Sequence, residues 1–444
     1  MSNNKLIPEL RFPEFKNEGE WLQKKLGEIG EPLMCKRILK EQTTTNSKNG
    51  IPFYKIGTFG KEADAYIPIK LFEEFKNKYS FPKNGDILIS AAGTIGRLVV
   101  YNGLPAYFQD SNIVWLGNDE SMVFNSYLFH CYSTIKWQTS DGGIISRLYN
   151  SDLKNIKIFY SKNTEEQQKI ASCLSSLDEV IAAHSQKLDL LKHHKKGLMQ
   201  NLFPQSRLNC DSFDSNDEND FKNQSNQENH KNHSSDNIPK YRFKEFENDG
   251  GEWVEKKLGE VAIFLKGKGI SKSDIVEGGN LPCIRYGELY THYKETIDAI
   301  KSFTNLSSNE LVLSESNDVI IPASGETQID IATASCVLKS GIALGGDLNI
   351  IRSGIDGVFL AYYLNSAKKS DIAQLAQGIS VVHLYPSQLQ TLSISFPKNQ
   401  KEQQKIASCL SSLDALITAQ AKRIEQLKIH KKGLMQGLFP KMSE

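Results

Sequence analysis

One stretch of this sequence occurs twice, and the duplication limits the folds that are open to the chain. Residues 166–178 read EQQKIASCLSSLD, and residues 402–414 repeat them letter for letter. Over the 39 residues from 166 to 204, 27 are identical to the residue 236 positions later. A repeat of this length indicates that the chain is a tandem duplication of one structural unit.

Weaker matches extend the duplication upstream into two variable regions. The matching pairs are PELRFPEF (8–15) with PKYRFKEF (239–246), WLQKKLGE (21–28) with WVEKKLGE (253–260), IPFYKIG (51–57) with LPCIRYG (281–287), NGDILISA (84–91) with NDVIIPAS (317–324), and SRLYNSDL (146–153) with VHLYPSQL (382–389). Short apolar runs such as Asp86–Ser90 and Asp318–Ile321 predict strands, and Ser126–Trp137 predicts a helix. We therefore expect each half to be an α+β domain followed by the repeated segment.

The repeated segment has the residue spacing of a coiled-coil seam. Apolar residues recur at 4-3-4-3 intervals from 170 to 202 in the first copy and from 406 to 438 in the second. Polar residues interrupt the seam at matching places, namely His184 and Lys195 in the first copy and Gln420 and Lys431 in the second. This pattern predicts two long helices that bury their seams against each other.

Cues in the sequence mark both ends of these helices. Asn163 and Asn399 stand where N-caps are expected, each with a glutamate three residues later. Pro204 and Pro440 end the two helices, because proline cannot continue the hydrogen-bond ladder.

A polar segment joins the two halves. Residues 205–238 hold three basic and seven acidic residues, so their net charge is −4, whereas the whole chain carries +1. Between 209 and 237 the only apolar residues are Cys210, Phe213 and Phe221. Such a composition cannot bury enough surface to offset the entropy of ordering, so we predict a flexible linker.

Basic residues recur at matching places in the two variable regions. Each alone is more typical of a solvated surface charge, but recurrence in two diverged domains favours a shared ligand. Basic and polar loop residues suit contacts with DNA phosphates and base edges. The candidate DNA-binding residues are Lys36, Lys40, Lys55, Arg97 and Arg147 in the first half, and Lys266, Lys268, Lys272, Arg285 and His383 in the second.

The sequence carries no motif for catalysis or for metal binding. It lacks a G-x-x-x-x-G-K-[ST] loop, an H-E-x-x-H motif and the Asn-Pro-Pro-aromatic tetrapeptide of an amino-methyltransferase, and its seven cysteines stand singly without a C-x-x-C pair. A net charge of +1 neither requires nor excludes nucleic acid. No apolar run approaches a membrane span and no signal peptide is recognisable, so we expect a cytoplasmic protein.

Together these features resemble the specificity (S) subunit of type I restriction-modification systems. The resemblance depends on the duplicated EQQKIASCLSSLD segments with their HKKGLMQ and LFP ends, on the W-x-x-KKLGE openings, and on GGDLNIIR at 345–352. It covers essentially the whole chain except residues 205–238.

The resemblance implies a fold and a function. The fold would be α+β, with two globular target-recognition domains separated by two long conserved helices that form an antiparallel coiled coil with pseudo-twofold symmetry. The chain would be a non-catalytic subunit that reads a bipartite, asymmetric site in double-stranded DNA. It would dock two methyltransferase (M) subunits and two restriction/motor (R) subunits. It would bind no cofactor itself, because S-adenosylmethionine, ATP and Mg²⁺ are expected on the partner subunits.

The duplication and the resemblance together predict a division into five parts. These are a first target-recognition domain (1–160), a central conserved helix (161–204), a polar linker (205–238), a second target-recognition domain (239–397) and a distal conserved helix (398–444).

Two other classes of function stay open at this level. The chain could be a coiled-coil adaptor whose globular heads bind protein, in which case it would not bind DNA even at low salt. It could also be an enzyme with a cryptic nuclease or methyltransferase site, in which case the isolated chain would have its own activity.

Overall fold

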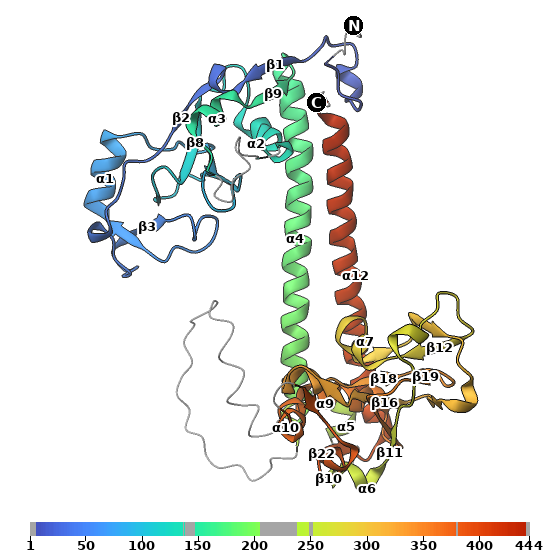
Figure 1. The fold of residues 1–444 in the computed structure, drawn as a ribbon. Coiled ribbons are helices and arrows are strands. Elements are labelled where there is room, and N and C mark those ends of the chain that lie inside the picture. Colours follow the sequence, from blue (N-terminus) through green and yellow to red (C-terminus); the bar gives the residue numbers. More distant parts are fainter. Residues whose placement is uncertain are drawn as a thin grey trace. The chain divides into compact units, whose positions relative to one another are not determined.

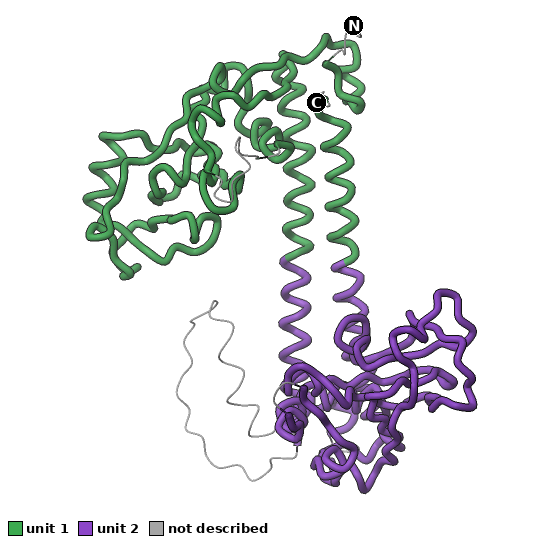
Figure 2. The backbone as a smooth tube through the Cα atoms, viewed as in Figure 1, with its two compact units in different colours: residues 1–185, 422–444 green, residues 186–421 purple. Residues whose placement is uncertain are grey.

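The computed structural model describes residues 6–135, 137, 147–204, 238–247, 252–378 and 381–440, so nearly all of the predicted linker lies outside the described residues. The chain forms two compact units (Figure 2). Unit 1 comprises residues 1–185 and 422–444, and unit 2 comprises residues 186–421. Each unit therefore combines one globular region with parts of both repeated segments.

Unit 1 is built on two small sheets and a strand pair (Figure 1). The first sheet has the order β2-β8-β5-β6, with β2 Gly30–Leu33, β5 Ile87–Ser90, β6 Leu98–Val100 and β8 Ile113–Asn118. The second has the order β4-β3-β7, with β3 Gly50–Tyr54, β4 Tyr66–Pro68 and β7 Tyr107–Phe108. The remaining elements are the pair β1 Leu22–Lys25 with β9 Lys157–Tyr160, and the helices α1 Ile69–Lys78, α2 Asn125–Thr134 and α3 Asn150–Asn155.

Unit 2 has larger versions of the same sheets. One has the order β11-β20-β16-β18-β13, with β11 Ala262–Lys266, β13 Thr296–Ile297, β16 Asp318–Pro322, β18 Ser335–Val337 and β20 Leu348–Ser353. The other has the order β14-β12-β19-β15, with β12 Leu281–Ile284, β14 Ser302–Thr304, β15 Val312–Leu313 and β19 Ala343–Leu344. Two strand pairs complete it, β10 Trp253–Lys257 with β22 Ser393–Pro397, and β17 Ser324–Gly325 with β21 Val382–His383. Its short helices are α5 Lys244–Glu247, α6 Leu258–Val261, α7 Tyr286–Thr291, α8 Gln328–Ile331, α9 Gly357–Ser366, α10 Lys369–Leu375 and α11 Pro386–Leu389.

The strand pairing confirms that the two variable regions share one fold. The order β2-β8-β5 in unit 1 corresponds to β11-β20-β16 in unit 2, and both sets are antiparallel. The parallel pair β3–β7 corresponds to the parallel pair β12–β19. The antiparallel pair β1–β9 corresponds to β10–β22 and leads into the long helix in both cases. The α+β class and the predicted strands are therefore confirmed.

The repeated segments are two helices of 39 residues each, α4 Thr164–Leu202 and α12 Gln400–Leu438. Their seam residues are buried or half-buried along the whole length, as the heptad spacing predicts. The side chain of Asn163 accepts a hydrogen bond from the amide of Glu165 at 2.9 Å, and that of Asn399 does the same for Lys401 at 2.9 Å. Both predicted N-caps are thus present.

Contacts inside each unit show that α4 and α12 pack antiparallel. In unit 1, Lys431 near the end of α12 donates to Asp178 near the start of α4 at 2.5 Å. In unit 2, Lys195 near the end of α4 lies 2.8 Å from Asp414 near the start of α12. The two seam lysines that the sequence placed at matching positions therefore each bind a carboxylate of the partner helix.

A buried arginine–glutamate pair fixes the start of each long helix. Arg11 donates two hydrogen bonds to Glu166, at 2.6 and 2.7 Å, and the Glu166 side chain has no exposed surface. Arg242 makes the same two-point contact with Glu402, at 2.7 and 2.6 Å, and Glu402 is equally buried. The paired glutamate raises the pKa of Arg11, so the arginine stays charged and neutralises the buried carboxylate.

The same two segments also bind the end of the other long helix. The amide of Leu10 donates to Gly437 of α12 at 2.8 Å, and the amide of Tyr241 donates to Asn201 of α4 at 2.9 Å. Residues 8–15 and 239–246, which we call straps, thus each connect one helix start with one helix end within a unit.

The first prediction concerns this pair. Arg11→Ala should lower the free energy of unfolding by about 3–5 kcal/mol, because it leaves the Glu166 carboxylate buried without a partner. Chemical denaturation of the full chain measures this change. The matched control is Lys169→Ala, which removes the exposed Lys169–Glu14 pair and should change stability by less than about 1 kcal/mol. Equal effects of the two substitutions would contradict the proposed importance of burial.

A buried histidine lies between α2 and α4 in unit 1. His130 is fully buried, and its Nε2 atom lies 3.1 Å from the hydroxyl of Ser175. Burial, together with the charge of Lys431, lowers the pKa of His130 from 6.5 to about 4. In unit 2 the corresponding residue is Tyr362, which donates to Asp414 at 2.5 Å.

The second prediction follows from that pKa. Between pH 6.5 and 4 the unfolded chain binds a proton at His130 that the folded chain does not, so stability falls as the pH falls, by about 1.4 kcal/mol per pH unit. His130→Gln should flatten this part of the stability curve, whatever its effect at neutral pH. His430→Gln, at an exposed position of α12, is the control for replacing a histidine outside the core. A wild-type slope in the His130 variant would show that this histidine is not the group responsible.

Candidate nucleic-acid interface

Three segments of unit 1 converge at the predicted cations. They follow β2 (34–40), follow β3 (55–61) and connect β7 to β8 (109–112). The hydroxyl of Tyr107 donates to the carbonyl of Lys36 at 2.9 Å, and the amide of Gln109 donates to Tyr54 at 2.9 Å. These bonds hold the backbones of the segments together, and Lys40 and Lys55 line one groove. The Lys36 ammonium instead lies over the Tyr79 ring, 5.3 Å from its centroid.

A groove of about 590 Å³ opens between these segments. Its lining includes Arg37, Lys40, Lys55, Asp64 and Asp110. Lys55 pairs with Asp64 at 2.8 Å and Arg37 with Asp110 at 2.9 Å. The Lys55–Asp64 pair is exposed on both sides, so a phosphate can displace Asp64 at little energetic cost. The Asp110 side chain is only 17% exposed, whereas its partner Arg37 is 67% exposed.

The corresponding segments of unit 2 converge in the same way. The amide of Gly345 donates to Ile284 at 2.8 Å, as Gln109 does to Tyr54, and the amide of Lys268 donates to Leu344 at 3.0 Å. A Cβ atom at Gly267 would lie 1.9 Å from the carbonyl oxygen of Gly345, so only glycine allows this approach. Lys268 and Lys272 are exposed on this loop, and Arg285 lies beside Gly345.

In each unit a fourth segment, which contains Arg147 in unit 1 and His383 in unit 2, is bonded to the strand-end segment at Ala91 or Ala323. In unit 1 the amide of Leu148 donates to Ala91 at 2.9 Å, and in unit 2 the amide of Leu384 donates to Ala323 at 3.0 Å. The residues just before these two leucines are Arg147 and His383, so the predicted correspondence between this arginine and this histidine is confirmed.

The turns before β8 and β20 differ in length, and this difference displaces one match between the two halves. The sequence matches Gln109–Asn112 with Gly346–Asn349, but the turn before β8 has four residues and the turn before β20 has three. The amide of Ala91 donates to Asn112, whereas the amide of Ala323 donates to Asp347. Asn112 and Asp347 are therefore equivalent, and the alignment is displaced because unit 1 has one additional residue in the turn.

The predicted cations differ in what they bind. The guanidinium of Arg97 donates to the carbonyl of Phe59 at 2.9 Å, and that of Arg147 donates to Ser111 at 2.9 Å, so both hold loop backbones. Lys266 ends β11 and is exposed, and the His383 ring lies 3.4 Å from the hydroxyl of Ser324.

Sequence reasoning missed Arg37. Its side chain is 67% exposed and it lines the same groove as Lys40 and Lys55. The comparison of the two halves could not reveal it, because its counterpart in the second half is Gly269.

The cysteines of the two globular regions are buried. Burial raises the pKa of Cys35 and of Cys336 to about 12 and that of Cys283 to about 11, so these thiols are not reactive nucleophiles. Among the residues that the structure describes, no three His, Cys, Asp or Glu side chains are arranged to hold a metal ion. No helix in the described ranges is long and apolar enough to cross a membrane.

Comparison with known proteins identifies the family. The family model of the type I restriction modification DNA specificity domain matches residues 18–193 and 250–428. A putative type I restriction enzyme specificity subunit of Haemophilus influenzae is 54% identical over 165 residues, which cover 37% of this chain and 42% of that protein. The putative MjaX specificity subunit of Methanocaldococcus jannaschii is 24% identical over 441 residues, covering 95% of this chain and 93% of that protein.

A solved structure shows the same fold. The crystal structure of the type I restriction-modification S subunit from M. genitalium aligns with a TM-score of 0.58 at 16% identity, over 98% of this chain and all of that one. Since the family model matches most of both halves, this chain belongs to the type I restriction-modification DNA specificity family, as a specificity (S) subunit, the DNA-recognising and non-catalytic component of such enzymes.

Proposed function

We propose that this chain reads a bipartite, asymmetric site in double-stranded DNA, with the loops of unit 1 on one half-site and those of unit 2 on the other. One observation carries the proposal: the same loop segments converge in both units, joined by equivalent main-chain bonds, but present different side chains. A shared framework with different loop residues is what two distinct half-sites require.

The candidate contacts fall into two groups. Exposed cations such as Lys36, Lys40 and Lys268 suit DNA phosphates, which are recognised mainly by charge. Arg97 and Arg147 act by positioning, because each holds the carbonyl of a neighbouring loop.

The proposal extends to the partners. The chain would dock two methyltransferase subunits and two restriction/motor subunits in the cytoplasm, and those subunits would bring S-adenosylmethionine, ATP and Mg²⁺. A chain from a structural study of complex assembly in a type I system shares this fold, with a TM-score of 0.50 at 15% identity. The proposed division into recognition regions 1–160 and 239–397, with conserved helices 161–204 and 398–444, follows from the duplication.

The third prediction tests the phosphate contacts. Alanine at Lys36, Lys40, Lys268 or Lys272 should each reduce the slope of log K against log salt by about one unit, and should weaken binding to specific and random duplexes alike. Alanine at Lys55 should have a smaller effect, because Asp64 already neutralises this cation in part. Fluorescence anisotropy across a salt series measures both quantities.

The matched control for these variants is Lys405→Ala, an exposed cation of α12 that pairs with Glu245. It should leave the salt slope unchanged. A wild-type slope in the combined variant of the four loop lysines would remove them from the interface. Absence of DNA binding at low salt would favour a protein-binding adaptor.

The fourth prediction tests whether each unit recognises one half-site. Replacing residues 1–160 with the same region of another specificity subunit should change one half of the methylated motif and leave the other intact. Genome-wide mapping of methylated adenine, with the methyltransferase partner co-expressed, gives the motif directly. A change in both halves, or in neither, would reject the assignment of one half-site to each unit.

A further inference from the structure

Four exposed rings form a continuous surface on the loops of unit 2. The rings of Tyr286 and Tyr290 lie 6.4 Å apart, and the Tyr290 hydroxyl donates to Ser324 at 2.8 Å. Ser324 pairs with His383 across β17 and β21, and the His383 ring stacks on Tyr385 with centroids 6.2 Å apart. The three tyrosines are 38%, 38% and 48% exposed in chain order. We call Tyr286, Tyr290, His383 and Tyr385 the ring surface.

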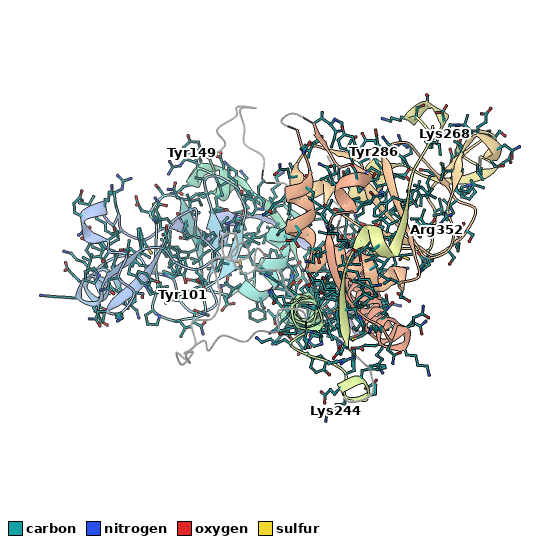
Figure 3. All side chains as sticks on the ribbon, turned by 90° about the horizontal axis from the view of Figure 1, so that it is seen from below. Tyr101, Tyr149, Lys244, Lys268, Tyr286 and Arg352 are labelled. Carbon is teal, nitrogen blue, oxygen red and sulfur yellow. The ribbon has the colours of Figure 1, made fainter. Side chains whose placement is uncertain are left out.

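The ring surface is continuous with the candidate DNA interface. Tyr286 directly follows Arg285, and Tyr385 lies two residues after His383. Figure 3 shows Tyr286 and Lys268 toward one edge of unit 2 and the strap residue Lys244 at the opposite edge. Tyr286 therefore lies toward the same edge of unit 2 as Lys268, and not toward the strap.

The charges around His383 and Tyr385 do not suit phosphate. Neither the segment 323–331, which holds β17 and α8, nor the segment 381–385 contains a lysine or an arginine. The first of these segments exposes Glu326 and Asp330. The corresponding loop of unit 1 has no carboxylate and ends in Arg97. Carboxylates repel the DNA backbone but accept hydrogen bonds from cytosine, and aromatic side chains contact thymine methyl groups and base faces.

Unit 1 provides an independent observation. The residue equivalent to Tyr385 is Tyr149, which is 62% exposed. The two tyrosines occupy the same backbone position, since the amide of Tyr149 donates to Asp152 and the amide of Tyr385 donates to Gln388. These bonds use only the main chain of each tyrosine, so the cap does not require the exposed ring in either unit.

We propose that the ring surface contacts base edges of the second half-site, with His383 and Tyr385 as specificity-determining residues that act through their rings. This inference rests on the proposed function. It names the residues by which unit 2 would distinguish its DNA half-site from other DNA sequences. Affinity from these rings should be insensitive to salt, in contrast to the affinity from Lys268 and Lys272.

The test uses the full chain with its methyltransferase partner, whose methylated motif defines the cognate duplex. Tyr385→Ala and the double variant with His383→Ala should bind that duplex about 5- to 150-fold more weakly. Their binding to a random duplex and their salt slope should stay at the wild-type values. Replacing a contacted thymine of the second half-site by uracil removes one methyl group and should weaken wild-type binding about fourfold. In Tyr385→Ala, replacing the same thymine by uracil should not weaken binding further.

Two control variants accompany the test. Tyr241→Ala removes an equally exposed tyrosine from the strap of unit 2 and should bind as the wild type does. Tyr149→Ala should weaken discrimination at the first half-site only. Circular dichroism of each variant shows whether it folds, and Tyr385→Phe keeps the ring if the alanine variant is unstable.

Three results would overturn the inference. The first is unchanged cognate binding in the double variant. The second is an equal loss on cognate and random DNA with a reduced salt slope, which would indicate phosphate contact. The third is loss of methyltransferase association without loss of DNA binding, which would make the rings a protein-docking surface. Failure of the wild type to bind a bipartite site would instead reject the proposed function itself.

Discussion

The first turn of each long helix contains a glutamate side chain that has no access to solvent, and the rest of the fold is arranged around its neutralisation. A buried carboxylate needs a partner of opposite charge with good geometry, and Arg11 and Arg242 supply it through two hydrogen bonds each. The arginines belong to the straps, which also bind the ends of the opposite helices. One interaction thus connects a globular region with both members of the helix pair inside each unit, and it explains why the arginine and the glutamate occur in both copies.

Much of the helical framework could be predicted from the sequence, because helix formation follows local spacing. The seam from Ile170 to Leu202 and the caps at Asn163 and Asn399 follow from residue types at short, regular spacings in the sequence. The pairing of Arg11 with Glu166 was not predictable, although both residues belong to recognised repeats, since 155 residues separate them. Glu166 and Glu402 stand three residues after the N-cap asparagines, where the sequence suggested a role in capping. In the structure they pair with Arg11 and Arg242 instead.

The candidate interface was predicted in part for the same reason. Comparison of the halves identified Lys36, Lys40, Lys268 and Lys272, because cations at equivalent positions appear in both copies. It could not identify the contacts that bring the loops together, such as those of Gln109 and Gly345, because these are main-chain bonds. Nor could it reveal exposed rings, because exposure depends on what the surrounding loops leave uncovered. The comparison of the halves shows that Tyr149 and Tyr385 are shared, but only the structure shows that both rings are exposed.

The discontinuous composition of unit 1 has a consequence for the order in which the protein becomes complete during synthesis. Its core includes Leu438 and Phe439, and the Phe439 ring packs against Trp21 and Tyr127 with centroid distances of 6.4 and 5.6 Å. The globular region that leaves the ribosome first therefore has an uncovered apolar face until the last residues of α12 have been made. Unit 2 is formed by one continuous range of the chain, so its core does not depend on the last residues of α12. Unit 1 is therefore synthesised first but completes its core last. A nascent chain that stops before α12 exposes the aromatic cluster that Phe439 covers in the complete protein.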